Sequence, residues 1–202
     1  MSFGYLGDTS TKIKQQVKNQ GVISISEAYE LEKAGHLGGS LKLISSTTFS
    51  SQSQVDITSG FTGFDVFHIS CTEIVPSTNA NFGFQLFESG TIEDAGVYKI
   101  MKPFFQVDGG SGEEQSGSAS RVSGLAAVQT TDKAGIYLNC FGFTDGTQYS
   151  FVTHQNAPSY TADYETKFGG AVLPQASVVD GIRFTMNTGT FSGKINLYGY
   201  KT

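Results

Sequence analysis

From Leu41 to the C-terminus, apolar and polar residues alternate with a period of two, in short runs separated by Gly, Asn, Asp and Ser. Because successive side chains of a β-strand point to opposite faces of a sheet, this pattern predicts half-buried strands. No helical pattern alternates with them, which argues against a parallel α/β sheet. We expect strands at 41–45, 55–58, 64–71, 82–87, 97–101, 121–130, 135–143, 148–153, 167–173, 182–186 and 191–198.

This series of short strands predicts an all-β fold, an antiparallel β-sandwich of jelly-roll type over residues 41–202. The composition agrees, since 16 Phe and 9 Tyr with only 15% charged residues are too aromatic and too weakly charged for a disordered chain. The clearest hairpin signal joins 182–186 to 191–198 through the turn residues at 187–190. We therefore expect these two strands to pair.

Residues 1–40 have a different pattern. It predicts one short helix that ends at Gly21 and a second over 25–34, which begins with a capping box of Ser24 and Glu27. Helices this short are marginal alone in water, so we expect the segment to dock on a larger partner. The apolar residues available for docking are Ile13, Val17, Ile25, Tyr29 and Leu31.

Charge and cysteine content exclude several classes of protein. The net charge is −5 with no basic cluster, so we expect no nucleic-acid partner. No apolar stretch approaches 18 residues, so we expect no membrane insertion, and the first residues lack a secretory signal. Cys71 and Cys140 each sit in a strand-like apolar run, which predicts buried free thiols rather than a disulfide or metal site.

Motifs for catalysis or metal binding are missing from the sequence. The three histidines, His36, His68 and His154, are isolated, and there is no Gly-x-Ser-x-Gly elbow. We therefore expect no catalytic residue, no metal and no cofactor. A less favoured alternative is a small carbohydrate-active enzyme, which needs two carboxylates across a cleft. Its candidate acids are Glu88, Glu93, Asp94, Asp163 and Glu165.

The segment 108–119 is rich in Gly and Ser and has no apolar residue larger than Ala. It therefore predicts a long loop, and long loops in compact domains are mostly functional or mobile. Recognition residues often lie on loops of a rigid scaffold, so a host-receptor- or glycan-binding module is a second hypothesis. Its candidate residues are Asn156, Tyr160, Tyr164, Asp108 and Glu113.

The last strand has an unusual second face. Tyr198 and Tyr200 alternate with the apolar residues Ile195 and Leu197, so they fall on the face that should point away from the core. Tyrosine is enriched in the centre of protein interfaces. We predict that this face contacts another subunit or the segment 1–40, in a homo-oligomer such as a trimer or another closed ring.

Both ends of the chain carry a resemblance. The sequence begins with FGYLGDTSTKIKQQVKNQGV at 3–22, continues as ISEAYELE at 25–32 and reaches GGSL at 38–41. This resembles the N-terminal module of virion proteins from marine tailed phages, cyanophages and pelagiphages among them. The residues GTFSGKINLYG at 189–199 resemble the terminal strand of the same family.

The resemblance implies a structural component of a virion, either a tail fibre or other appendage or a capsid-decoration protein. It implies no enzymatic activity, synthesis in the host cytoplasm, and other virion proteins as partners, with a host receptor or glycan as a further one. A marginal helical segment joined to a β domain fits such a role, although a fold alone does not decide a function.

Overall fold

The computed structural model describes residues 29–30, 41–158 and 165–200. The chain divides into two units, one with residues 1–40 and 201–202 and the other over Leu41–Tyr200, which is described by itself below. The predicted N-terminal helices lie outside the described residues except for Tyr29 and Glu30, which are helical, and the Tyr29 side chain is exposed. In the part of the chain that the structure covers, no helix has the length and apolar character to cross a membrane.

The described residues of the unit Leu41–Tyr200 are all-β, as predicted, and their strands form antiparallel sheets. The strands are β1 (Lys42–Gln52), β2 (Gln54–Ile57), β3 (Val66–Pro76), β4 (Ala80–Glu88), β5 (Thr91–Ile92), β6 (Tyr98–Gln106), β7 (Ser111–Ala119), β8 (Val122–Val128), β9 (Ala134–Phe141), β10 (Tyr149–Pro158), β11 (Glu165–Ala176), β12 (Val179–Met186) and β13 (Phe191–Tyr200).

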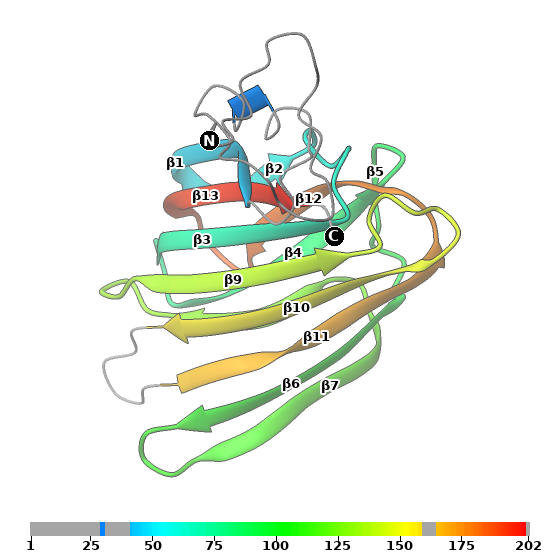
Figure 1. Cartoon of the computed structure of the whole chain (residues 1–202). Helices are drawn as coiled ribbons and strands as arrows, with labels where there is room; N and C mark the ends of the chain where they lie inside the picture. Colours follow the sequence, from blue (N-terminus) through cyan, green and yellow to red (C-terminus); the bar gives the residue numbers. More distant parts are fainter. Residues whose placement is uncertain (1–28, 31–40, 159–164, 201–202) are drawn as a thin grey trace, which may run out of the picture. The chain divides into compact units, whose positions relative to one another are not determined.

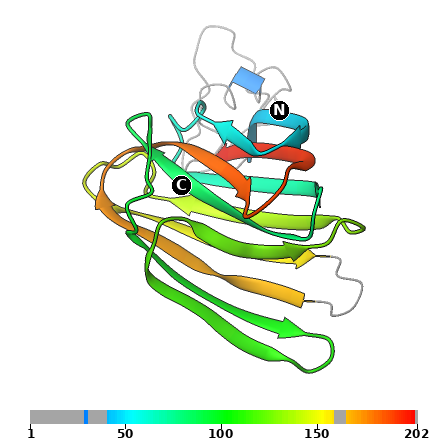
Figure 2. The same ribbon diagram turned by 180° about the vertical axis from the view of Figure 1, so that it is seen from behind.

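The strands form two sheets. The large sheet has eight strands in the order β1-β13-β3-β9-β10-β11-β6-β7. The small sheet has the order β2-β12-β4-β5, and β8 also pairs with β4. Figure 1 looks onto the large sheet, and Figure 2, from behind, shows β4 and β12 of the small sheet in front. The chain passes repeatedly from one sheet to the other, so both sheets are built from the whole length of the unit.

One hydrophobic core joins the two sheets. Phe82 of β4 stacks on Phe184 of β12, with ring centroids 5.5 Å apart, and meets the edge of Phe191 from the large sheet at 5.7 Å. Each of these rings is at most 1% exposed, and full burial of such a side chain stabilises the fold by about 2–3 kcal/mol. Cys71 and Cys140 are buried and free in this core, as predicted.

All eleven predicted strands are present in the described residues, but the predicted hairpin is wrong. Strand β12 pairs with β2 and β4, whereas β13 pairs with β1 and β3. Both strands direct their apolar residues into the same core from opposite sides, so the turn between them carries the chain from one sheet to the other. The Asn187 N–H donates to the Asn81 carbonyl at 3.0 Å and ties this turn to β4.

The predicted long loop over 108–119 is also wrong. The turn after β6 closes within a few residues, where the Gly109 N–H donates to the Gln106 carbonyl at 3.1 Å. The remaining residues form β7, which pairs with β6 along its length. Because β7 lies at the edge of the large sheet and is mostly exposed, it needs none of the apolar residues that mark an interior strand.

Candidate functional site

The outer face of the large sheet, which is turned away from the small sheet, carries rows of aromatic side chains. The register places Tyr137 of β9 opposite Gln155 of β10, which in turn lies opposite Phe168 of β11. In the same way Phe141 lies opposite Phe151. Alternate residues of neighbouring strands share a face, so these rings come together although they are far apart in sequence.

Seven large apolar side chains on this face are between 36% and 57% exposed. Phe105 and Phe168 stack on each other at 6.0 Å, and Tyr137 stacks on His68 at 5.9 Å. Figure 1 looks directly onto the strands that carry them. We call this surface the aromatic face, and its residues are Met101, Phe105, Tyr137, Phe141, Tyr149, Phe151 and Phe168.

The middle of the aromatic face carries no charge. The outward positions of β9, β10 and β11 hold no Lys, Arg, Asp or Glu among the described residues. Charged side chains begin only at its margins, with Lys99 on β6, Glu113 on β7 and Lys194 on β13. A centre rich in aromatic residues and free of charge, with a polar rim, is the anatomy of a protein–protein interface.

The two tyrosines of the last strand lie beside this surface. Ile195 and Leu197 are buried in the core, and Tyr198 and Tyr200 occupy the opposite face of β13, as predicted. The Tyr198 ring lies 6.0 Å from His68, which itself stacks on Tyr137. The predicted tyrosines therefore extend the aromatic face towards β13, and their contact with another subunit remains a prediction.

Of the predicted receptor residues, the structure describes Asn156, Asp108 and Glu113, and these three lie in different surroundings. Asn156 is not at a loop tip: it is buried in β10, where its Oδ1 accepts from the Lys167 N–H at 2.6 Å and its Nδ2 donates to the Leu125 carbonyl. Asp108 lies in the β6–β7 turn and accepts from the Gly110 N–H at 3.0 Å. Glu113 is exposed on β7, and Tyr160 and Tyr164 lie outside the described residues.

Sequence reasoning missed a charged cluster on the inner face of the same sheet. Lys102 of β6 and Lys167 of β11 each lie 2.7 Å from a carboxylate oxygen of Glu114 on β7, and Lys167 also lies 3.2 Å from Glu165. Lys102 further donates to the Ser123 carbonyl of β8, which holds β8 against the large sheet. The only sequence signal was that Lys102 follows Ile100 at the inward positions of β6.

Burial sets the protonation of this lysine cluster, which comprises Lys102, Lys167, Glu114, Glu165 and His154. Burial lowers the pKa of Lys102, and the Glu114 carboxylate partly offsets that effect. Burial would raise the pKa of Glu114, but hydrogen bonds from the two lysines bring it below its usual value. Burial, and then Lys102 and Lys167, lower the pKa of His154 to about 4. The cluster thus joins β6, β7 and β11 through paired charges, and β8 through the Ser123 carbonyl.

The candidate acids of the enzyme alternative lie in different surroundings where the structure describes them. Burial raises the pKa of Glu88 to about 7, and the neighbouring Glu93 carboxyl adds to this effect. The Ser177 hydroxyl donates to the Glu88 carboxylate, and the Ala95 N–H donates to the Glu93 carboxylate at 2.7 Å. Glu165 lies in the lysine cluster, and Asp163 lies outside the described residues. Among the described side chains, no three His, Cys, Asp or Glu residues gather as a metal site.

Comparison with known proteins adds no assignment: no protein-family model matches the chain, and the search of curated proteins gives no match.

Proposed function

We propose that this chain is a non-enzymatic structural protein of a tailed-phage virion, a tail-fibre or other appendage component or a capsid-decoration protein, which assembles as a homo-oligomer. The virion setting rests on the resemblance at the two ends of the sequence. The observation that supports assembly is the uncharged aromatic face of the large sheet, whose seven apolar side chains come from β6, β9, β10 and β11. In this proposal residues 1–40 attach the protein to the particle.

The aromatic face is large enough to hold two copies together. An aromatic side chain buries about 200 Å² in full, so seven that are half exposed offer about 700 Å². A standard protein interface takes about 800 Å² from each partner, and the flanking Thr, Gln and Gly residues supply the remainder. A contiguous apolar patch of this extent on a monomer would exceed the few hundred Å² that the apolar patches of soluble monomeric proteins cover.

A second copy of the chain is the partner that fits the charge distribution best. The protein carries a net charge of −5, so most of its surface repels another copy. The outward positions of β9, β10 and β11 hold no charge and escape this repulsion. When the same patch serves on both subunits, the interface is isologous and two-fold.

The chain's repeated crossing between its two sheets supports the finer assignment of its fold to the jelly-roll type.

The test is to remove two rings from the aromatic face. In a variant with Phe151→Ser and Phe168→Ser, we expect the mass measured by sedimentation to fall from a multiple of 21.6 kDa to 21.6 kDa. A central interface ring contributes about 2 kcal/mol and a two-fold interface carries each ring twice, so each change should weaken self-association about a thousandfold. Both side chains are half exposed, so the variant should keep its fold and its circular dichroism spectrum.

Val178→Ser is the matched control, because Val178 is an equally exposed apolar residue in the turn between β11 and β12. This variant should keep the mass of the unaltered chain. The proposal is wrong if the unaltered chain sediments as a 21.6 kDa monomer at about 0.1 mM, or if the double variant keeps the oligomeric mass.

A further inference from the structure

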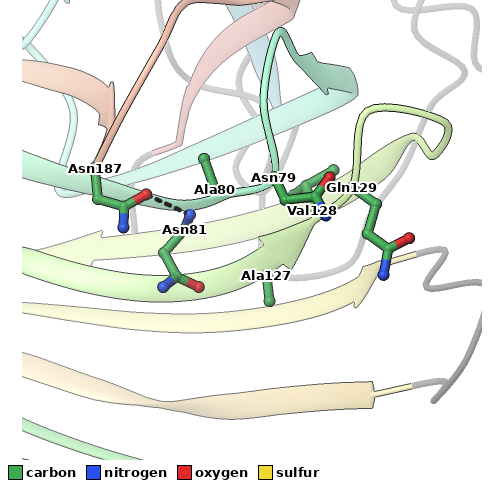
Figure 3. A pocket seen from close by; sticks show the side chains of 7 residues that line it. All are labelled: Asn79, Ala80, Asn81, Ala127, Val128, Gln129 and Asn187. Carbon is green, nitrogen blue, oxygen red and sulfur yellow. Dashed lines mark hydrogen bonds between the residues drawn. The ribbon is translucent and has the colours of Figure 1, made fainter.

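A small cavity opens where three connections of the β unit meet, away from the aromatic face. It has a volume of about 210 Å³ and is lined by residues at the start of β4, the end of β8 and the turn after β12. Figure 3 shows these side chains around it. Four of its seven lining residues carry a carboxamide, namely Asn79, Asn81, Gln129 and Asn187, and none carries a charge. We call it the amide cavity.

Two of the amides are held by their oxygen atoms. The Asn187 Oδ1 accepts from the Asn81 N–H at 2.8 Å, the bond that Figure 3 draws as a dashed line. The Asn79 Oδ1 accepts from the Thr130 N–H at 3.1 Å. Because each oxygen is engaged by the backbone, the NH₂ group is the end of each side chain that is left to donate to a ligand.

The wall of the cavity is also fixed in place. The Ser77 N–H donates to the Thr190 carbonyl at 2.8 Å, and the Thr190 N–H donates to the Ser77 hydroxyl at 2.9 Å. These bonds join the β3–β4 turn to the β12–β13 turn. A site built from side chains that are already ordered loses less conformational entropy when a ligand binds.

We propose that the amide cavity binds one ring of a neutral saccharide. Oriented NH₂ donors suit the hydroxyl and ring oxygens of a sugar, and the absence of charged side chains disfavours an anion or a cation. The half-buried Ala127 supplies a small apolar surface for the C–H groups of the ring, above the buried Val128. The volume is below the 300 Å³ or so of a drug-sized site, which limits the ligand to a single ring.

Nitrogen–proton correlation NMR of the full chain, which resolves the side-chain NH₂ groups, tests the proposal. The probes are glucose, galactose, mannose and N-acetylglucosamine, with glucuronate as the charged comparison. A ligand of this size should bind with a Kd of about 1 mM. We expect at least one neutral sugar to shift the NH₂ signals of Asn79 and Asn187 in a saturable way, and glucuronate to shift them less.

The variants Asn79→Asp and Asn187→Asp test the NH₂ donors without removing the hydrogen bonds that hold the turns. Each carboxylate still accepts the backbone N–H that the amide oxygen accepts, so the turn is kept while the NH₂ donor is lost. We expect each variant to raise the Kd about tenfold or more at an unchanged melting temperature. Gln115→Glu, the same chemical change on the exposed edge strand β7, should leave the Kd unaltered.

Two outcomes would overturn the inference. One is that none of the four neutral sugars shifts these signals at about ten times the expected Kd. The other is that a sugar binds equally well to both Asp variants. Neither outcome bears on the assembly proposal, because the amide cavity shares no residue with the aromatic face.

Discussion

His154 is a single residue whose burial makes the fold sensitive to acid. Its side chain lies on the inner face of β10, and its Nε2 has no hydrogen-bond partner among the described residues. The charged groups that face it are Lys102, Lys167 and Glu114. Burial and the two lysines lower its pKa from 6.5 to about 4, so the folded protein keeps it neutral where the unfolded chain would protonate it.

We predict that the contribution of His154 to the free energy of unfolding falls as the pH is lowered from 6.5 to 4, whereas Glu88, whose pKa is raised to about 7, acts in the opposite direction. Over this range the unfolded state binds a proton at His154 that the native state does not, so the His154 contribution rises with pH and is fully present above 6.5. The loss at pH 4 is at most about 3 kcal/mol, from about 1.4 kcal/mol for each pKa unit. Urea unfolding at several pH values measures it.

The difference between the unaltered chain and His154→Gln isolates this contribution, because Gln does not titrate and Glu88 is the same in both. Thr153→Gln changes the neighbouring exposed residue of β10 to the same side chain and should keep the dependence of the unaltered protein. An equal slope in the unaltered chain and in His154→Gln would show that other groups cause the acid sensitivity.

At the scale of elements, Glu114 fixes the edge strand β7 to two interior strands. Its carboxylate accepts from Lys102 of β6 and Lys167 of β11, whose side chains are at most 5% exposed. Removing one partner of a fully buried pair costs about 3–5 kcal/mol, because the other charge is left without compensation. Glu114 itself is 45% exposed, so water offsets part of this cost.

We predict that Glu114→Gln lowers the free energy of unfolding by about 2 kcal/mol, measured by urea unfolding at pH 7. Glu73→Gln is the matched control, because Glu73 meets Lys133 at 3.7 Å and both side chains are mostly exposed. The control should change stability by less than about 0.5 kcal/mol. Similar losses in both variants would contradict the view that burial gives the Glu114 pairs their strength.

The sequence predicted the interior strands better than the edge ones. Strands such as β9 and β13 place an apolar residue at every second position, so one buried face was enough to find them. Strand β7 has no apolar residue larger than Ala, and its position depends on the ion pairs of Glu114 instead. The alternation of apolar and polar residues along one strand gives no information about ion pairs between strands that are distant in the sequence.

At the scale of the whole molecule, the pairing of strands was the part that the sequence could not provide. Strands β12 and β13 follow each other closely, yet they belong to different sheets because both bury apolar residues in one core. The aromatic face also depends on which strands pair. Tyr198 could be placed on the outer side of its own strand, but Tyr137, Phe151 and Phe168 meet only through the registers of β9, β10 and β11.

The two buried thiols report how often the β unit unfolds. Cys71 and Cys140 lie in the paired strands β3 and β9, fully buried, and burial raises the pKa of each thiol far above neutral pH. Only the thiolate reacts with an alkylating reagent, so neither residue can react until the strands around it separate. We therefore expect both cysteines to be labelled together in dilute denaturant, measured by mass spectrometry, at a rate that global unfolding controls. Labelling of one cysteine well before the other would instead reveal that the large sheet opens in parts.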